Sequence, residues 1–235
     1  TATEDFQRYY NWTVTNTAEY KFDFLDDHYV TILLGQESMS NKDQSFRARA
    51  EGLTDPRLLL MSAAATGVKP THSIAEEVRN SWFGTLNYSY AEKYFVDLSI
   101  RRDGSSLFGE NNRWATFGAA AAMWKISREK FMEGTKSWLN NLDLKASYGT
   151  TGNSGIGAYL ALGLVGTGPL YDGNSGSAIA NPSNPDLSWE KVKTLNLGIS
   201  ARLFNRIDID LEYYNKETSD MLMDIPYSYT TGFSG

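Results

Sequence analysis

Arg101, Arg102 and Asp103 form a dense cluster of charged side chains, which Arg113 follows a short way on. Guanidinium groups form charge-assisted, often bidentate hydrogen bonds with carboxylates, so these residue types could hold an anionic or hydroxyl-rich ligand. The same chemistry could instead tie a loop to a neighbouring wall. We favour the structural interpretation and keep all four residues as candidate binding residues.

Two other motifs imitate known ligand sites. The run GTTGNSGIG at residues 149–157 follows an expected strand but opens no helix, and its glycine order fits neither the dinucleotide nor the P-loop pattern. Asp172, Asn174 and Gly176 imitate the start of a calcium loop but lack the downstream Glu at the required offset. We therefore interpret both segments as loops.

Catalytic and cofactor chemistry finds little support in the composition. The 235 residues include no Cys and two His, and neither His28 nor His72 has partners in a metal-ligand pattern. No Ser/His/Asp set or pair of carboxylates stands out. The net charge of −6 gives no support for nucleic-acid binding. We expect no enzyme activity, no metal and no cofactor.

Strands must position the charged cluster, because the residues before it alternate with a period of two. Tyr94, Val96, Leu98 and Ile100 form an apolar row, and the opposite row is Phe95, Asp97, Ser99 and Arg101. The same alternation predicts eight strands, at residues 10–22, 28–36, 78–90, 94–101, 113–126, 142–148, 189–203 and 207–214. Between them we expect long loops at 38–77 and 150–186, a short helix at 55–65 and a helical connector at 127–138.

The placement of aromatic residues on the apolar faces indicates whether these strands face lipid or water. Aromatic residues stand near both ends of a face, as in the pairs Trp12 and Tyr20, Trp82 and Tyr90, and Trp114 and Trp124. A separation of about eight residues spans ~26 Å, close to the apolar band of an outer-membrane barrel. Short and long connections also alternate. A soluble β-sandwich shows the same alternation of side chains, so it stays an alternative.

The residues also resemble a known family. The chain is similar to the barrel of the SusC/RagA family of TonB-dependent outer-membrane transporters in the segments HYVTILLGQE, SWFGTLNYSYAEKYF, RRDGSSLFGENNRWATF, MWKIS, WLNNLDLKASYGTTGNSGIGAY and NPDLSWEKVKTLNLGISARLFNRIDIDLEYYNKETSDMLMDIP. Any one of these motifs alone is a weak signal, but their order along the chain is specific.

The resemblance implies an all-β, antiparallel, up-and-down transmembrane barrel of 22 strands in the outer membrane, with long extracellular loops and short periplasmic turns. Residues 1–235 would be an interior segment of about eight strands, without the plug or a signal peptide. Such transporters import oligosaccharides or peptides, with a SusD-like surface lipoprotein as a lid and TonB as the energy source. The alternatives are a self-standing small outer-membrane barrel with a structural or adhesive role, and a soluble β-sandwich binding module.

In such a barrel the polar rows of the strands would line the lumen. This predicts lumen positions for Asp97, Lys145, Asp208, Asp210 and Glu212, where their charges either meet cargo or pair with the plug and with one another. Tyr159 and Tyr171, in the second long loop, could stack on sugar rings. Lipids of the outer membrane would cover the apolar rows.

Overall fold

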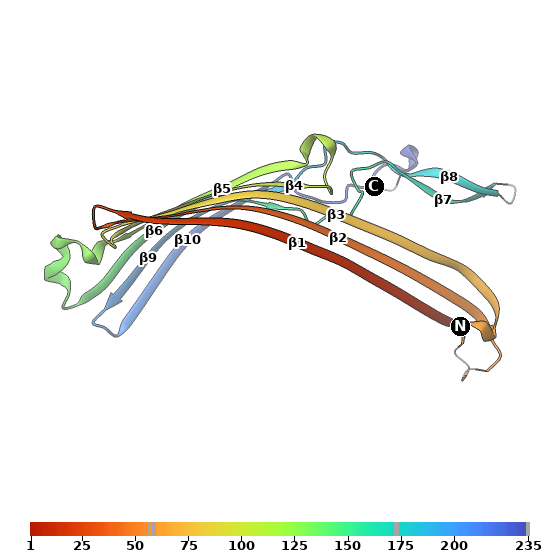
Figure 1. The fold of residues 1–235 in the computed structure, drawn as a ribbon, viewed down its shortest axis with the longest axis horizontal. Coiled ribbons are helices and arrows are strands. Elements are labelled where there is room, and N and C mark those ends of the chain that lie inside the picture. The colour runs from red at the N-terminus through yellow and green to blue at the C-terminus, as the bar shows by residue number, and fades with distance from the viewer. Residues whose placement is uncertain (56, 58–59, 172–173, 234–235) are drawn as a thin grey trace.

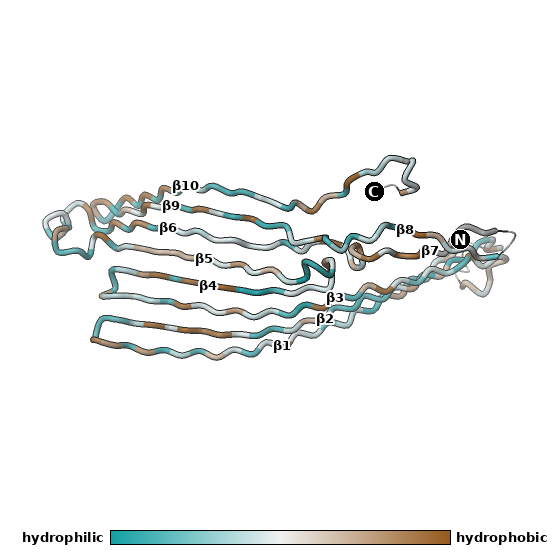
Figure 2. The backbone as a smooth tube through the Cα atoms, turned by 90° about the horizontal axis from the view of Figure 1, so that it is seen from above, coloured by the Kyte–Doolittle hydropathy of each residue, from teal (hydrophilic) through white to brown (hydrophobic). Residues whose placement is uncertain are grey.

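The eight long strands form one curved, open, antiparallel sheet, as the sequence predicts. The computed structural model describes residues 1–55, 57, 60–171 and 174–233. Neighbouring strands in the sheet follow chain order, and a separate two-stranded hairpin is inserted between β6 and β9 (Figures 1 and 2). The sheet contains β1 (Ala2–Phe24), β2 (His28–Leu53), β3 (Ala64–Tyr90), β4 (Tyr94–Ser105), β5 (Trp114–Lys125), β6 (Leu139–Asn153), β9 (Glu190–Leu203) and β10 (Ile207–Ser219); the hairpin contains β7 (Leu164–Tyr171) and β8 (Asn174–Asn181).

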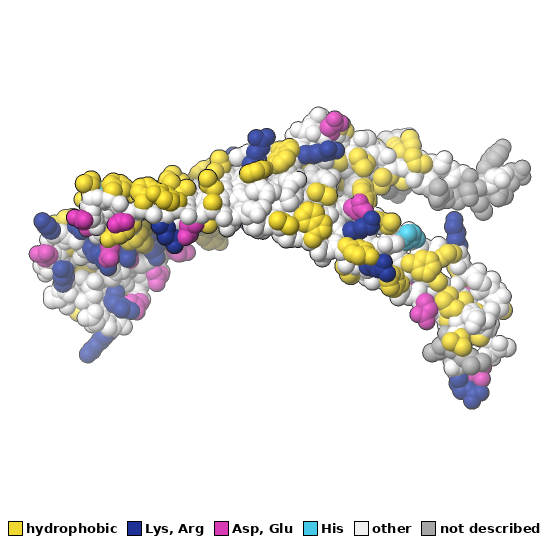
Figure 3. Space-filling view, viewed as in Figure 1, with side chains coloured by type: hydrophobic (Ala, Val, Ile, Leu, Met, Phe, Trp, Pro, Cys, Tyr) yellow, Lys and Arg dark blue, Asp and Glu magenta, His cyan; other side chains and the backbone are white. Residues whose placement is uncertain are grey.

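The register of the strands sorts the two rows of side chains onto two faces. Leu86 lies opposite Leu98, which lies opposite Ala120, and Ala120 lies opposite Tyr148, so the apolar rows join across four strands. In Figure 3 the hydrophobic side chains gather along the upper, convex side of the sheet near the short turns, and charged side chains lie beneath it. The convex face is therefore the apolar one and the concave face the polar one, as in a barrel wall.

A row of stacked aromatic rings crosses the convex face at the end with the short turns. Each of the first five strands contributes one ring: Phe24, His28, Tyr90, Tyr94 and Trp124. Successive ring centroids lie 4.6, 4.4, 6.0 and 6.1 Å apart. This row confirms that aromatic residues mark one boundary of the apolar band, where amphipathic rings favour the interface between lipid and water.

Glu129 fastens this aromatic row to the connector between β5 and β6. Its carboxylate accepts hydrogen bonds from Tyr94 Oη (2.6 Å), Trp124 Nε1 (3.2 Å) and Lys93 Nζ (3.0 Å). These donors hold the pKa of Glu129 below its ordinary value, and the hydrogen bond from Tyr94 is the largest cause. Because they favour the charged form, the carboxylate stabilises the fold above its ordinary pKa of about 4.3 and loses that contribution as the pH falls through the lowered value.

The expected long loop at 38–77 is wrong, because β2 and β3 continue through most of it. Their side chains pair across the strands, as Ser45 Oγ does with Ser73 Oγ (2.7 Å) and as Lys42 does with Glu76 in an ion pair. Polar residues occupy both faces over much of this part, so the alternation that reveals a strand is not sustained along the sequence. The expected helix at 55–65 is also wrong in the described part of that segment, where the one helical turn is the 3₁₀ turn Met61–Ala63. Pro56 and residues 58–59 lie outside the described residues.

The other two connections differ from expectation in detail. The connector expected as one helix consists of two 3₁₀ turns, Ile126–Arg128 and Lys130–Thr135. Ser127 does not cap it, because its hydroxyl donates to Asn141 Oδ1 at 3.0 Å. The expected loop at 150–186 contains the β7–β8 hairpin. Among the described residues, no helix is long and apolar enough to cross a membrane.

A small aromatic core closes the far end of the sheet, opposite the short turns. Phe108, Phe117 and Trp189 are at most 8% exposed, and the Trp189 ring lies 4.5 Å from Phe108 and 5.7 Å from Phe117 between centroids. We call these three residues the rim core. It joins the β4–β5 loop to the segment before β9.

Hydrogen bonds hold that junction beside the rim core. The Gly109 N–H donates to the Leu187 carbonyl at 3.0 Å, and Asn111 Nδ2 donates to Asp186 Oδ1 at 2.8 Å. Gly109 has a φ of −60°, so the reason for glycine is space and not conformation. A Cβ there would overlap the main-chain carbonyl of Pro185.

Replacing Gly109 with Ala should therefore destabilise the full-length protein by ~1–3 kcal/mol, because main-chain atoms cannot yield as a flexible side chain can. The measurement is the unfolding transition of the detergent-solubilised protein. Gly134→Ala is the matched control, because a Cβ at Gly134 meets nothing within 4 Å. Equal transitions for the two variants would contradict the proposed close contact.

Replacing Glu129 with Gln should flatten the acid side of the stability profile. The wild type loses the contribution of this carboxylate as the pH falls, and the variant has no such contribution to lose. Unfolding temperatures between about pH 3 and pH 7 measure the difference. Glu133→Gln on the same connector should follow the wild type, and a Glu129→Gln profile parallel to the wild type would refute the assignment.

Candidate functional site

Arg101 lies at the centre of a charged network on the concave face, near the end of the sheet with the long connections. Its Nε donates to Asp103 Oδ1 at 2.6 Å and its Nη2 donates to Glu37 Oε1 at 3.1 Å. The guanidinium also lies over the Phe83 ring, 5.2 Å from the centroid. Arg101 and Asp103 share a face because they are two residues apart on β4. The cation is therefore held by two carboxylates and an aromatic ring from three strands.

A glycine on the neighbouring strand makes room for that ring. Phe83 is opposite Gly35 in the β2–β3 register, and a Cβ at position 35 would overlap the Phe83 ring. An aromatic residue opposite glycine covers exposed main chain in many sheets. Here the ring lying over Gly35 also supports the Arg101 guanidinium.

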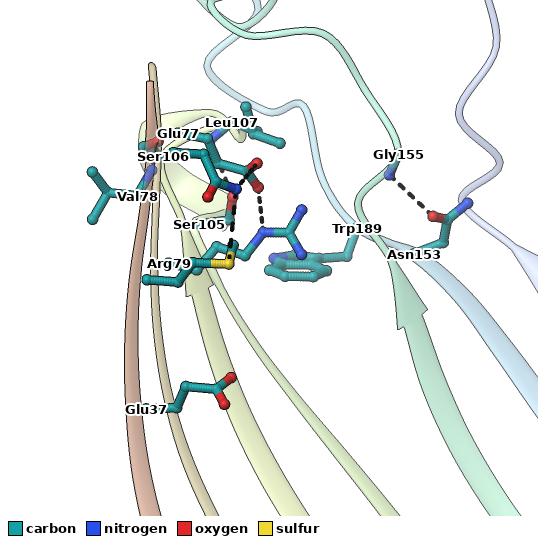
Figure 4. A network of polar contacts seen from close by, with 12 residues as sticks. Glu37, Glu77, Val78, Arg79, Ser105, Ser106, Leu107, Asn153, Gly155 and Trp189 are labelled. Atoms are coloured by element: carbon teal, nitrogen blue, oxygen red, sulfur yellow. Dashed lines mark hydrogen bonds and ion pairs between the residues drawn. The ribbon is translucent and has the colours of Figure 1, made fainter. Parts of the chain in front are cut away.

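A second ion pair continues the network along the same face. Arg79 pairs with Glu77, which also accepts a hydrogen bond from Asn41 Nδ2 at 3.5 Å. Figure 4 shows Glu77 and Arg79 together, with Glu37 further along the strands and Trp189 of the rim core close to Arg79. We call Glu37, Glu77, Arg79, Arg101 and Asp103 the rim network. It offers donors and carboxylate oxygens in fixed positions.

The other two arginines of the sequence cluster do not join this network. The Arg102 guanidinium lies over the Trp114 ring at 5.4 Å, and its strand register places it on the convex face opposite Trp82. Arg113 is exposed, and its main-chain carbonyl accepts from Trp189 Nε1 at 3.3 Å. The structure thus brings together Arg101 and Asp103 and separates Arg102 and Arg113 from them.

The predicted lumen residues all lie on the concave face. Asp97 accepts from Asn87 Nδ2 at 2.5 Å, and Lys145 Nζ donates to Ser200 Oγ at 2.8 Å. Asp208 accepts from Arg202 at 2.6 and 3.0 Å. In the register, Asp210 lies opposite Ser200 and Glu212 lies opposite Gly198, on the same face as the others.

The structure describes the side chain of Tyr159 but not that of Tyr171. Tyr159 has a positive φ of 69°, and its hydroxyl accepts a hydrogen bond from the Glu76 main-chain N–H at 3.0 Å. Its ring therefore joins the second long connection to β3. The Tyr171 side chain and Asp172 lie outside the described residues.

Comparison with known proteins decides the family. A family model described as TonB dependent receptor-like, beta-barrel matches residues 1–235. The chain belongs to this family. A TonB-dependent receptor of Formosa agariphila is 34% identical over 232 residues, which cover 95% of this chain and 23% of that protein. TonB-dependent receptor SusC of Bacteroides thetaiotaomicron is 35% identical over 162 residues, or 66% of this chain and 16% of SusC.

Solved structures agree with the sequence relatives. A chain from the structure of the RagAB peptide transporter superposes with a TM-score of 0.91 at 38% identity, covering 99% of this chain and 26% of that one. The segment therefore spans about a quarter of the length of that neighbour. The predicted SusC/RagA-like family, partial-barrel fold and outer-membrane location are confirmed, and the open single sheet is no β-sandwich.

Within this TonB-dependent receptor segment, sequence reasoning missed Glu37, Phe83 and Arg79. The signal that could have found them is the odd or even position of each residue along its strand, because that position sets the face on which the side chain lies. Glu37 and Arg79 stand in the polar rows of β2 and β3, and Phe83 breaks its polar row with a large ring. Only the cross-strand register shows that Glu37 and Phe83 meet Arg101 and that Arg79 lies on the same face.

A double-mutant cycle should separate Arg101 from its sequence neighbour. Arg101→Ala and Glu37→Gln should be coupled by about 0.5–1 kcal/mol, because both remove one partly exposed ion pair. Arg102→Ala and Glu37→Gln should be additive, because the two side chains lie on opposite faces. Urea unfolding of the full-length protein in detergent supplies the free energies, and equal coupling in both cycles would disprove the assignment of faces.

Proposed function

We propose that this segment is part of the wall of an energised outer-membrane importer. The observation that carries the proposal is the division of one continuous sheet into an apolar convex face and a charged concave face. Lipid explains the first face, because a charge at the bilayer midplane would cost about 2–4 kcal/mol. A water-filled or plugged lumen explains the second. In this role the segment catalyses no reaction and requires no cofactor.

The cargo we propose is a peptide or an oligosaccharide. The RagAB neighbours are described as a peptide transporter and peptide importer, which favours peptides. The rim network suits either class, because carboxylates, guanidinium groups and amides bind both main-chain amides and sugar hydroxyls. Among the candidate binding residues, we propose Arg101 and Asp103 for contact with cargo on the concave face, and Asp97, Lys145, Asp208, Asp210 and Glu212 as the lumen lining further along it. Tyr159 and Tyr171 remain candidates for stacking on sugar rings.

The partners we propose are a SusD-like surface lipoprotein and TonB. The strands β1–β3 and the hairpin β7–β8 project past the ends of the other strands, on the side opposite the short turns (Figure 1). Projections on that side suit contact with a lid outside the membrane. TonB would act through the plug that the family resemblance implies, so its contact falls elsewhere in the full-length protein.

A deletion strain tests import and identifies the cargo class. Loss of the full-length gene should abolish growth on one class of peptide or oligosaccharide supplied as the only nutrient source, and the wild-type gene should restore it. A protonophore should block uptake of the same compound, because TonB-dependent import draws on the proton gradient. Unchanged growth of the deletion strain on every peptide and glycan supplied would refute the proposal.

A further inference from the structure

One edge of β3 has no neighbouring strand even though both of its sequence neighbours are present. β3 begins at Ala64, whereas β4 ends at Ser105, which pairs with Arg79. Residues 64–78 of β3 therefore have β2 on one side and, within the described chain, no strand on the other. Open strand edges present main-chain donors and acceptors to solvent.

The hydrogen bonds around Val78 show which residues face this edge. The Ser106 N–H donates to the Val78 carbonyl at 3.0 Å, and the Val78 N–H donates to Ser106 Oγ at 2.9 Å. Main-chain groups of alternate residues point to the same side of a strand. The groups of Glu76, Ile74 and His72 therefore also point away from β2.

Both ends of this row are closed and its middle is open. The Glu76 N–H donates to Tyr159 Oη at 3.0 Å, and Pro70 has no N–H to offer. Among the described residues, no partner is found for the N–H groups of His72 and Ile74, nor for the carbonyls of His72, Ile74 and Glu76. We call residues 72–76 the open edge. Five extended residues span about 16 Å.

Side chains along the open edge are already paired with β2. His72 Nε2 lies 3.0 Å from Gln44 Nε2, and Glu76 forms an ion pair with Lys42. Ile74 is apolar and 42% exposed. The groups of this edge without partners are main-chain N–H and carbonyl groups, and another extended main chain supplies the complementary groups.

The surroundings of the open edge favour a short, free chain. In Figure 1, β3 is the strand of the β1–β3 projection that lies nearest to the β7–β8 hairpin. A folded partner would have to bring the edge of its own sheet between them. A single extended peptide needs only the width of one strand, about 5 Å.

We propose that the open edge binds a short extended peptide, which adds to β3 as an antiparallel strand. Residues opposite each other in such a pair share a face, so apolar side chains of the peptide would lie beside Ile74 and polar ones beside Ser73 and Ala75. The inference goes beyond the proposed import, because binding at this edge is measured without transport and can fail or succeed independently of it.

Two variants of Ile74 test the role of the main chain in the full-length protein in detergent. The probe is an acetylated, amidated peptide of roughly eight alternating Val and Thr residues, long enough to cover the edge. Ile74→Pro removes the outward N–H without breaking the β2–β3 ladder, and should weaken binding about five-fold. The matched control Ile74→Ala keeps the N–H and should bind within about two-fold of wild type. Calorimetry measures both, with the heat-modifiable mobility of the folded barrel as the check on folding.

Methylated probes give a second test on the wild-type protein, which does not depend on the folding of any variant. When Val lies beside Ile74, the N–H groups of the Val residues face β3 and those of the Thr residues face away. Methylation of the Val amides should therefore weaken binding at least about ten-fold, and methylation of the Thr amides should leave binding unchanged. The proposal is overturned if the unmethylated probe does not bind, if both methylated sets weaken binding equally, or if Ile74→Ala weakens binding as much as Ile74→Pro.

Discussion

The structure depends on one constraint: every main-chain polar group that lies in the hydrocarbon must be hydrogen-bonded within the sheet, and a charge that points outward becomes more costly the nearer it lies to the midplane. The strands meet it by alternation, and the register then carries the alternation from strand to strand. Two residues next to each other in sequence can therefore have unrelated environments. Arg101 is bound by carboxylates on the concave face, whereas Arg102 lies against Trp114 on the convex face.

Two belts of side-chain contacts fix this sheet at its ends. At the short turns, stacked rings from five strands and the carboxylate of Glu129 hold the hairpins side by side. At the opposite end, the rim core packs the β4–β5 loop against the segment before β9, with Gly109 pressed against Pro185. The rim network lies beside the second belt, so the positions of its charges depend on loop packing as well as on strand register.

The sequence predicted the membrane-spanning strands because lipid on one side and water on the other impose a period of two. It did not predict the strands in residues 38–77, because a strand with polar solvent on both sides has no need of a sustained alternation. Ser45 and Ser73 pair across two strands that are marked by short alternating runs at most. For the site, parity alone would have separated Arg101 from Arg102. The contacts of Arg101 with Glu37 and Phe83 join residues far apart in the chain, and only the register of three strands reveals them.

The long strands β1–β3 have a mechanical consequence. They cross the apolar band and continue beyond it as the same hydrogen-bonded ribbon, with one irregularity in the β2–β3 register, between Arg47 and Arg49, close to the tip. Where the ribbon leaves the band, the ladder is unbroken and supplies no hinge. A load applied near the tip is therefore carried along the strands as tension and bending into the wall itself. The projection is therefore a rigid extension of the barrel wall.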